Sequence, residues 1–319
     1  LRDKHLVALA ELINIPLAEV YEVSTFYAHF NVVKDSNYIA PEVTIRVCES
    51  LTCEMFGSKR IFDELKITKN KSLRVLKGPC MGRCQQAPTV CVGKNYVDKA
   101  DSKKVLQIIN KKDFEAKIPR YISFKEYKLN NGYSLFKKLI EKKISPDEIK
   151  KIVEKSNLKG KGGAGFPTSK KWDFVLANSE PRYLTINADE GEVGTFKDRH
   201  YLESDPHRFL EGVLISAKII NAKNAFIYLR DEYPAALEIL KMEINELVKF
   251  GLVEKDYILI RRGAGAYICG EESAMIESIE GKRGLPRHRP PYVAQIGLFG
   301  RPTLVNNVET VYWIRDIIE

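Results

Sequence analysis

The chain has 319 residues, of which 44% are hydrophobic and 29% charged, the balance of a globular protein that is long enough for two or three domains. Its formal net charge of +9 comes from 51 Lys and Arg against 42 Asp and Glu, and the lysines are interleaved with acidic residues along presumed helix faces. This pattern argues against a nucleic-acid-binding protein, and no apolar run is long enough for membrane insertion. Since no stretch has the pattern of a secretory signal peptide, we expect a cytoplasmic protein.

Residues 1–40 are predicted to form a helical lead-in. Apolar residues recur at helical spacing from Leu6 to Ile13, and Pro16 begins a second helix. Neither His5 nor His29 is expected to be a metal ligand, because a lone histidine in such a pattern is more often a surface or core residue.

Residues 41–117 are predicted to form a small α/β domain. Val43, Ile45 and Val47 alternate with polar residues, which is typical of a strand, and this strand leads directly to a cysteine. An amphipathic helix, a second strand, a third strand and a last helix follow in order. Their expected ranges are 56–65, 73–76, 89–92 and 103–109.

Four cysteines form two pairs, and each pair follows a predicted strand: Cys48 with Cys53, and Cys80 with Cys84. Four thiolates in this arrangement can hold one metal centre. Zinc is the alternative, but zinc sites favour closer pairs, whereas wider and unequal pairs on a small α/β domain favour an iron–sulfur cluster. A disulfide is not expected in a cytoplasmic chain, and Cys91, within an apolar strand, is expected in the core.

Residues 118–132 are predicted to be a linker, and a glycine-rich stretch from Gly160 to Trp172 follows in the next domain, 133–319. Four glycines within six residues leave backbone N–H groups uncovered, and Pro167 then begins a predicted helix over 168–178. A helix N-terminus offers unpaired donors and a positive dipole end, and Lys171 adds a full charge. The stretch is therefore predicted to bind a phosphate.

The glycine spacing also matches the Rossmann fingerprint, which requires a strand before the glycines. Residues 145–157 instead form a capping box followed by helix-spaced apolar residues. We therefore favour a nucleotide loop outside the Rossmann fold. A flexible connector is the other alternative, but it does not explain the aromatic residues Phe166, Trp172 and Phe174 around the loop.

Two acidic groups also lie beside glycine loops. The first follows a predicted strand over 183–187, and the second begins the helix after the loop 263–270. Carboxylates at a helix N-terminus repel a phosphate but accept hydrogen bonds from sugar or ribityl hydroxyls, although solvated loop charges and an ordinary first turn would explain either group alone. Alternating strands and helices indicate a parallel or mixed sheet between helix layers. The carboxylates are Asp189, Glu190, Glu192, Glu271 and Glu272.

Near the C-terminus, Asn306, Asn307 and Thr310 are predicted to lie one helical turn apart on a helix. Paired amides can bind a planar heterocycle or a ribityl chain, although helix capping explains one of them equally well. No set of nucleophile, histidine and acid is present. This suits hydride transfer, in which a cofactor reacts and the protein positions it.

Several of these motifs resemble the FMN- and NADH-binding flavoprotein family, which includes the flavoprotein subunit of respiratory complex I, NAD-reducing hydrogenases and NAD-dependent formate dehydrogenases. Residues 1–117 resemble the thioredoxin-like 2Fe-2S protein that accompanies this subunit. Residues 284–317 most resemble the β subunit of a soluble NAD-dependent formate dehydrogenase. The motifs are Gly-Lys-Gly-Gly-Ala-Gly-Phe-Pro-Thr at 160–168, Asn-Ala-Asp-Glu-Gly-Glu at 187–192, Gly-Ala-Tyr-Ile-Cys-Gly-Glu-Glu at 265–272 and Val-Asn-Asn-Val-Glu-Thr at 305–310.

The resemblance implies a set of cofactor-binding residues and one 2Fe-2S cluster on the four cysteines. Arg289 stands where complex I has a lysine, so that contact differs. NADH would stack on the flavin with the help of Gly163, Phe166, Phe174, Glu192 and Tyr292. FMN would be held by Gly160, Gly162, Lys171, Asn187, Asp189, Glu190, Tyr267, Gly270, Glu271, Glu272, Asn306, Asn307 and Thr310.

The expected fold is therefore α/β: a helical segment, a thioredoxin-like 2Fe-2S domain, and an FMN/NADH-binding domain that is not a standard Rossmann fold. The implied activity passes a hydride between NADH and FMN and single electrons to iron–sulfur centres, within a redox complex whose favoured partner is a formate dehydrogenase catalytic subunit. One alternative is the NADH-oxidising subunit of complex I or of an NAD-reducing or bifurcating hydrogenase. Another is a non-enzymatic electron-transfer or assembly subunit with an unused flavin site. The family's 4Fe-4S cysteines are absent from these residues, so we expect a fragment.

Overall fold

The computed structural model describes residues 1–34, 37–67 and 72–319, so parts of the predicted segments 1–40 and 41–117 lie outside the described residues. The chain divides into two compact units, which are described separately. Unit 1 contains residues 1–118 and two short segments from later in the sequence, Glu190–Phe196 and Asp231–Ala235. Unit 2 contains Pro119–Asp189, Lys197–Arg230 and Ala236–Glu319.

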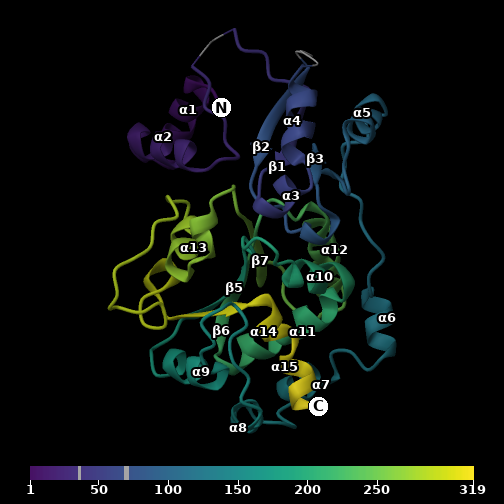
Figure 1. Cartoon of the computed structure of the whole chain (residues 1–319). Coiled ribbons are helices and arrows are strands. Elements are labelled where there is room, and N and C mark those ends of the chain that lie inside the picture. Colours follow the sequence, from purple (N-terminus) through teal and green to yellow (C-terminus); the bar gives the residue numbers. More distant parts are fainter. Residues whose placement is uncertain (35–36, 68–71) are drawn as a thin grey trace. The chain divides into compact units, whose positions relative to one another are not determined.

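Unit 1 contains two N-terminal helices and a four-stranded sheet with the order β2-β1-β3-β4 (Figure 1). Strands β1 and β2 are parallel, whereas β3 is antiparallel to both of its neighbours. Ile45, Val90 and Val92 are fully buried in its core, and for Ile45 the alternation with polar residues predicts this. The elements are α1 (Asp3–Ile13), α2 (Leu17–Phe26), β1 (Val43–Cys48), α3 (Leu51–Met55), α4 (Ser58–Ile67), β2 (Leu73–Gly78), β3 (Val90–Val92), β4 (Asn95–Val97) and α5 (Ser102–Asn110).

Unit 2 is built on a four-stranded sheet with the order β7-β6-β5-β8, in which every neighbouring pair is parallel. This confirms the predicted alternation of strands and helices. Its elements are α6 (Phe124–Leu129), α7 (Ser134–Ile140), α8 (Pro146–Lys155), α9 (Thr168–Leu176), β5 (Arg182–Ala188), α10 (Lys197–Ser204), α11 (Pro206–Ile219), β6 (Ala222–Leu229), α12 (Pro234–Lys249), β7 (Ile258–Arg262), α13 (Glu272–Ile279), β8 (Thr303–Asn307), α14 (Val308–Tyr312) and α15 (Ile314–Ile318).

Helix α11 forms the centre of the helical layer and is buried over most of its length. At Gly212 it meets the backbone of α14 so closely that an added Cβ would lie 1.9 Å from the carbonyl oxygen of Val311. A glycine is required here because any side chain would force the two helices apart.

The predicted linker, 118–132, contains helix α6. Its N-terminus is closed by the capping box of Ser123 and Glu126, and the side chains of Phe124 and Tyr127 are buried. The sequence pattern missed this helix because six residues are too few for helical periodicity to stand out. The segment therefore packs as part of unit 2.

A buried carboxylate anchors this segment. Glu211 on α11 is fully buried and accepts a hydrogen bond from the Tyr127 hydroxyl at 2.7 Å. It also accepts from the backbone N–H groups of Tyr133 at 2.9 Å and Phe136 at 3.3 Å. These donors lie at the start of α7, where backbone N–H groups have no carbonyl partner within the helix. One side chain thus fixes both α6 and α7 against α11.

The predicted helix carrying Asn306 and Asn307 is wrong in part. Both residues end strand β8, and the helix α14 begins only at Val308. The amide oxygen of Asn307 caps that helix by accepting from the backbone N–H of Glu309 at 3.0 Å. The helical spacing of the neighbouring apolar residues was misleading, because β8 becomes a strand by pairing with β5.

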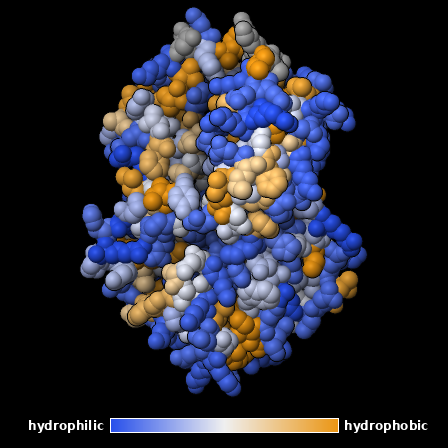
Figure 2. Space-filling model, viewed as in Figure 1, coloured by the Kyte–Doolittle hydropathy of each residue, from blue (hydrophilic) through white to orange (hydrophobic). Residues whose placement is uncertain are grey.

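The visible surface is mostly hydrophilic, and its apolar side chains occur in separate small groups (Figure 2). This agrees with the interleaved charges of the sequence. Among the residues that the structure describes, no helix has both the length and the apolar character to cross a bilayer.

Candidate functional site

The predicted flavin residues of unit 2 gather at the carboxyl ends of two adjacent parallel strands. From β5 the chain proceeds to β6 and β7 on one side, and β8 is then added on the other side of β5. Such a reversal of strand order leaves a crevice at the carboxyl edge, which is where open α/β sheets bind ligands. Asn187 and Asn307 are paired across β5 and β8 at this point.

The glycine loop lies beside this end of the sheet. Its ends are joined by hydrogen bonds from Gly160 N to Phe166 O at 2.8 Å and from Thr168 N to Leu158 O at 2.9 Å. Within the loop, Gly163 has φ of 116°, a left-handed backbone that favours glycine. Helix α8 precedes the loop where the Rossmann fingerprint requires a strand, so the Rossmann alternative is not supported.

The loop lies directly against the C-terminal asparagines. The backbone N–H of Lys161 donates to Thr310 Oγ1 at 2.9 Å. A Cβ added at Gly162 would lie 3.2 Å from the Cβ of Asn307, closer than ordinary van der Waals contact. The structure therefore brings the first and last predicted FMN motifs together.

Helix α9 and strand β8 present polar atoms that lack partners. Thr168 Oγ1 and Asn306 Nδ2 are buried and have no hydrogen-bond partner among the described residues. Nearby, Lys171 Nζ donates to the Val305 carbonyl at 2.8 Å and lies 3.7 Å from the Glu272 carboxylate. A buried polar atom without a partner costs free energy, so these residues fit a polar ligand such as the FMN phosphate or ribityl chain.

The two carboxylates after the second glycine loop have different partners. Glu271 caps α13 by accepting from the backbone N–H groups of Ser273 and Ala274, each at 2.9 Å. It also forms an ion pair with Arg289, which lies 3.1 Å from Glu272 as well. Both carboxylates are thus paired with a cation of the chain itself, and Glu271 already occupies two of the N–H donors at the start of α13.

The remaining polar residues come from the end of β5. Asn187 Nδ2 donates to the Gly270 carbonyl at 2.8 Å, and its Oδ1 accepts from the backbone N–H of Asp189 at 3.0 Å. Tyr267, in the short 3-10 helix before α13, is 68% exposed.

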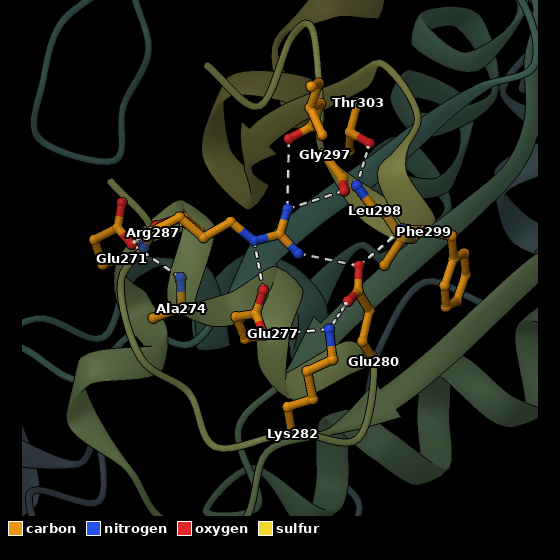
Figure 3. A network of polar contacts seen from close by, with 12 residues as sticks. Glu271, Ala274, Glu277, Glu280, Lys282, Arg287, Gly297, Leu298, Phe299 and Thr303 are labelled. Carbon is orange, nitrogen blue, oxygen red and sulfur yellow. Dashed lines mark hydrogen bonds and ion pairs between the residues drawn. The ribbon is translucent and has the colours of Figure 1, made fainter. Parts of the chain in front are cut away.

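An arginine network holds the loop that follows α13 (Figure 3). Arg287 donates to Glu277 at 2.5 Å, to Glu280 at 3.1 Å and to the Gly297 carbonyl at 3.0 Å. The loop fixed in this way carries Arg289 and Tyr292. The adjacent cavity of about 500 Å³ is lined by Lys282, Arg287, His288 and Phe299, among others, and contains no predicted FMN or NADH residue.

Two aromatic residues offer a stacking surface beside the glycine loop. The ring centroids of Phe166 and Phe174 are 5.9 Å apart, and the side chains are 39% and 57% exposed. Tyr292 is also exposed, on the loop after α13. Exposed aromatic rings provide planar apolar contacts of the kind that a nucleotide base uses.

The sequence pattern missed a pair of residues that position Asn307. The buried Asp198 on α10 accepts from Asn307 Nδ2 at 2.6 Å, and Lys197 Nζ donates to Asn307 Oδ1 at 3.1 Å. Lys197 also contacts Asp198 at 2.6 Å and Glu309 at 3.2 Å. The sequence did offer one signal for these residues, because Lys197 and Asp198 are an adjacent charged pair shortly after the acidic loop.

Glu190 and Glu192 are the predicted flavin-site residues that belong to unit 1 rather than unit 2. Glu190 is buried and accepts a hydrogen bond from the Tyr233 hydroxyl at 2.8 Å. The boundary between the two units therefore falls within the acidic loop, after Asp189. The assignment of Glu190 to FMN and of Glu192 to NADH stays a prediction.

The four paired cysteines also lie in unit 1. Cys48, Cys53 and Cys80 are buried and Cys84 is half-buried, with Cys80 Sγ 3.4 Å from Cys84 Sγ. A hydrogen bond from Cys48 lowers the pKa of Cys53 to about 7. Cys53 lies on helix α3.

The chemistry of this donor set fits an iron–sulfur cluster. Side-chain hydrogen bonds link Cys48 to Cys53 and to Cys80, and Cys80 to Cys84, so the four sulfurs form one group. A 2Fe-2S cluster takes its four thiolates as two pairs, one pair on each iron. Cys91 is buried beside the set, and burial raises its pKa to about 12, as expected of a core thiol.

Lys171→Ala is expected to weaken FMN binding. It removes a full positive charge near the start of α9, where the phosphate is predicted to bind. A hydrogen bond to a charged group contributes ~1.5–3 kcal/mol, which corresponds to about 10- to 150-fold in Kd. Fluorescence titration of the apoprotein with FMN measures this. Lys170→Ala, which changes the exposed neighbouring lysine, is the control, and equal affinities for the two variants would contradict the role of Lys171.

Comparison with known proteins agrees with both units. The family model described as the Nuo51 FMN-binding domain matches residues 153–316, and the model described as a thioredoxin-like [2Fe-2S] ferredoxin matches residues 1–113. The F subunit of NADH-quinone oxidoreductase of Aquifex aeolicus (strain VF5) is 53% identical over 211 residues, which are 64% of this chain and 49% of the relative. The F 2 subunit of the same enzyme of Rhizobium meliloti (strain 1021) is 47% identical over 201 residues, covering 60% of this chain and 48% of the relative.

A solved structure covers nearly the whole chain. The air-oxidized NAD+-reducing [NiFe]-hydrogenase matches with a TM-score of 0.85 and 31% identity, over 99% of this chain and 58% of that chain. The chain spans about half the length of the curated relatives it matches. With a family match over residues 153–316, the chain belongs to the Nuo51 FMN-binding domain family, and its N-terminal part is a thioredoxin-like [2Fe-2S] ferredoxin domain.

Proposed function

We propose that the chain is an NADH dehydrogenase (diaphorase) module, in which bound FMN exchanges a hydride with NAD(H) and single electrons with iron–sulfur centres. The observation that carries this proposal is the linkage of the predicted FMN motifs at the carboxyl ends of β5 and β8. Asn187 donates to the Gly270 carbonyl, the Lys161 N–H donates to Thr310, and Lys171 contacts both the Val305 carbonyl and Glu272. The 2Fe-2S ferredoxin domain on the same chain supplies an electron acceptor.

The chain's own groups have separate tasks in this proposal. The loop amides and Lys171 bind the phosphate, because they combine N–H donors with a positive charge. Asn187, Asp189 and the Glu271–Glu272 pair accept hydrogen bonds from hydroxyls of the ribityl chain. Phe166 and Phe174 stack against the nucleotide, which orients the nicotinamide toward the flavin. No side chain needs to act as a nucleophile.

The direct experiment is an absorption spectrum of the anaerobically purified protein, followed by addition of NADH. Flavin bands that bleach with NADH support the proposal. Flavin bands that persist, or a protein that binds no FMN while it retains the cluster, would favour the electron-transfer or assembly subunit instead. A small artificial acceptor then measures turnover at the flavin.

NADH is expected to be strongly preferred over NADPH. Glu192, with Asp189 and Glu190 nearby in sequence, accepts hydrogen bonds from ribose hydroxyls in this proposal and repels a 2′-phosphate. The ratio of kcat/KM for the two nucleotides measures the preference, and comparable values would refute it. Glu192→Lys is expected to reduce the ratio, with Glu154→Lys on an exposed face of α8 as the charge-matched control.

The complex to which the chain belongs is a separate question from its flavin chemistry. The resemblance of residues 284–317 favours a formate dehydrogenase, whereas the relatives compared above are NADH-quinone oxidoreductase subunits and an NAD+-reducing hydrogenase. We propose that the chain belongs to a cytoplasmic redox complex, and specifically that it is the β subunit of an NAD-dependent formate dehydrogenase. Co-purification of the native complex, followed by assays for formate-, hydrogen- and quinone-linked NAD(H) turnover, distinguishes the three.

A further inference from the structure

The four proposed cluster ligands differ in where their hydrogen bonds originate. Cys48 Sγ lies 3.1 Å from Ser50 Oγ, and the backbones of Thr89 and Gly82 hydrogen-bond to Cys53 and Cys80. These partners all come from the ferredoxin domain itself. Cys84 also has a local partner in the Thr52 side chain, but its sulfur accepts in addition from the backbone N–H of Gly194 at 3.2 Å, 110 residues away in sequence.

Gly194 lies in the segment Glu190–Phe196, which packs within unit 1. The Tyr233 hydroxyl donates to Glu190 at 2.8 Å at the start of this segment. Tyr233 is buried and its ring covers Gly82, where an added Cβ would lie 2.3 Å from the tyrosine oxygen. Because Gly82 stands between Cys80 and Cys84, the tyrosine fixes the Gly194 segment against the cysteine loop.

The second inserted segment, Asp231–Ala235, is itself anchored. His29 Nδ1 lies 2.8 Å from the Asp231 carboxylate, and the Tyr96 hydroxyl donates to the Glu232 carbonyl at 2.6 Å. These contacts position Tyr233 from two other elements of unit 1. The Gly194 N–H therefore has a defined place near Cys84.

We propose that the Gly194 N–H is a tuning donor to the Cys84 ligand and raises the midpoint potential of the 2Fe-2S cluster. On reduction the cluster gains one electron, and the added negative charge spreads over the thiolate sulfurs. A hydrogen bond to a sulfur stabilises this reduced state more than the oxidised state, which shifts the potential upward. The proposal rests on the four-cysteine ligand set proposed above, and it makes a segment from outside the ferredoxin sequence a determinant of the cluster's electron affinity.

The test is an EPR-monitored redox titration of the full chain and of Gly194→Ala. Gly194 has φ of 88°, a left-handed backbone in which alanine is strained, so the substitution displaces the N–H from Cys84. The expected result is a midpoint shifted to more negative potential with unchanged iron and sulfide per chain. Val193→Ala, which shortens an exposed side chain of the same segment and retains the Gly194 N–H, should leave the midpoint unchanged.

Two further measurements decide the question even if Gly194→Ala folds poorly. Tyr233→Phe removes the hydroxyl that holds Glu190 but keeps the ring against Gly82, and it should shift the midpoint in the same direction by less. Pulsed EPR of the reduced protein labelled with ¹⁵N-glycine should show a second coupled nitrogen besides that of Gly82, and this coupling should be lost in Gly194→Ala.

The outcomes separate the two proposals. A wild-type protein that contains no 2Fe-2S cluster overturns the ligand set and this inference together. A wild-type cluster with normal iron content, no Gly194 nitrogen coupling and a midpoint unaffected by Tyr233→Phe overturns this inference alone. Loss of that coupling together with a negative shift supports it.

Discussion

Cys80→Ser is expected to abolish the absorption and EPR signals of the 2Fe-2S cluster while FMN binding is retained. Cys80 is buried and its sulfur lies 3.4 Å from that of Cys84, so it belongs to the centre of the thiol group. A serine hydroxyl is a much weaker acid than a thiol, so it is a far poorer ligand to iron than a thiolate. The FMN residues proposed on the glycine loop, β5, β8 and α13 belong to unit 2 and do not include this side chain.

Iron and acid-labile sulfide analysis of anaerobically purified protein measures the loss, and it should be nearly complete. The matched control is Cys91→Ala, which removes a buried thiol of the same cluster of side chains that is not a proposed ligand. This control should retain the full cluster. Wild-type protein that contains zinc without iron or sulfide would show that the ligand set holds a different metal.

Glu211→Ala is expected to destabilise unit 2 by ~3–5 kcal/mol, the cost of removing one partner from a buried ionic network. The substitution leaves the Tyr127 hydroxyl and the backbone N–H of Tyr133 without their acceptor, and it leaves Arg315, 3.5 Å away, without one of its ion-pair partners. It also removes the negative charge at the N-terminus of α7, which the helix dipole favours. Helices α6 and α7 should detach first.

Urea unfolding followed by tryptophan fluorescence measures this effect specifically, because both tryptophans, Trp172 and Trp313, belong to unit 2. Glu154→Ala, which removes an exposed carboxylate from α8, should change the free energy of unfolding by less than ~0.5 kcal/mol. A loss for Glu211→Ala as small as that of the control would mean that the buried network contributes little to stability.

Local patterns predicted those parts of the fold that depend on neighbouring residues. The capping box at Ser145 and Glu148 is present, with hydrogen bonds in both directions, and helix α8 begins where Pro146 predicted it. Cys48 ends strand β1, as the alternating apolar residues before it predicted. All the residues that make up such a signal lie within about one helical turn or one strand.

Features that depend on distant partners were missed or misread. Asn306 and Asn307 fit a helix as well as a strand in isolation, and only pairing with β5 selects the strand. Asp198 could not be recognised because its role is to accept a hydrogen bond from the Asn307 amide, 109 residues later in the sequence. Helix α6 is short and is stabilised by Glu211, so its own six residues carry little information. Tertiary contacts decided each case.

The position of β8 in the sheet has a consequence for biosynthesis. This last strand pairs with β5, and Asn307 and Thr310 contact the glycine loop, so the flavin crevice cannot close until nearly all of these residues have left the ribosome. The ferredoxin sheet, in contrast, needs no strand beyond β4. Because domains fold from the N-terminus as they emerge, the cysteine strands can assemble while the flavin half is still being translated. We therefore expect the ferredoxin sheet to form before the proposed flavin site is complete, because its strands come first in the chain.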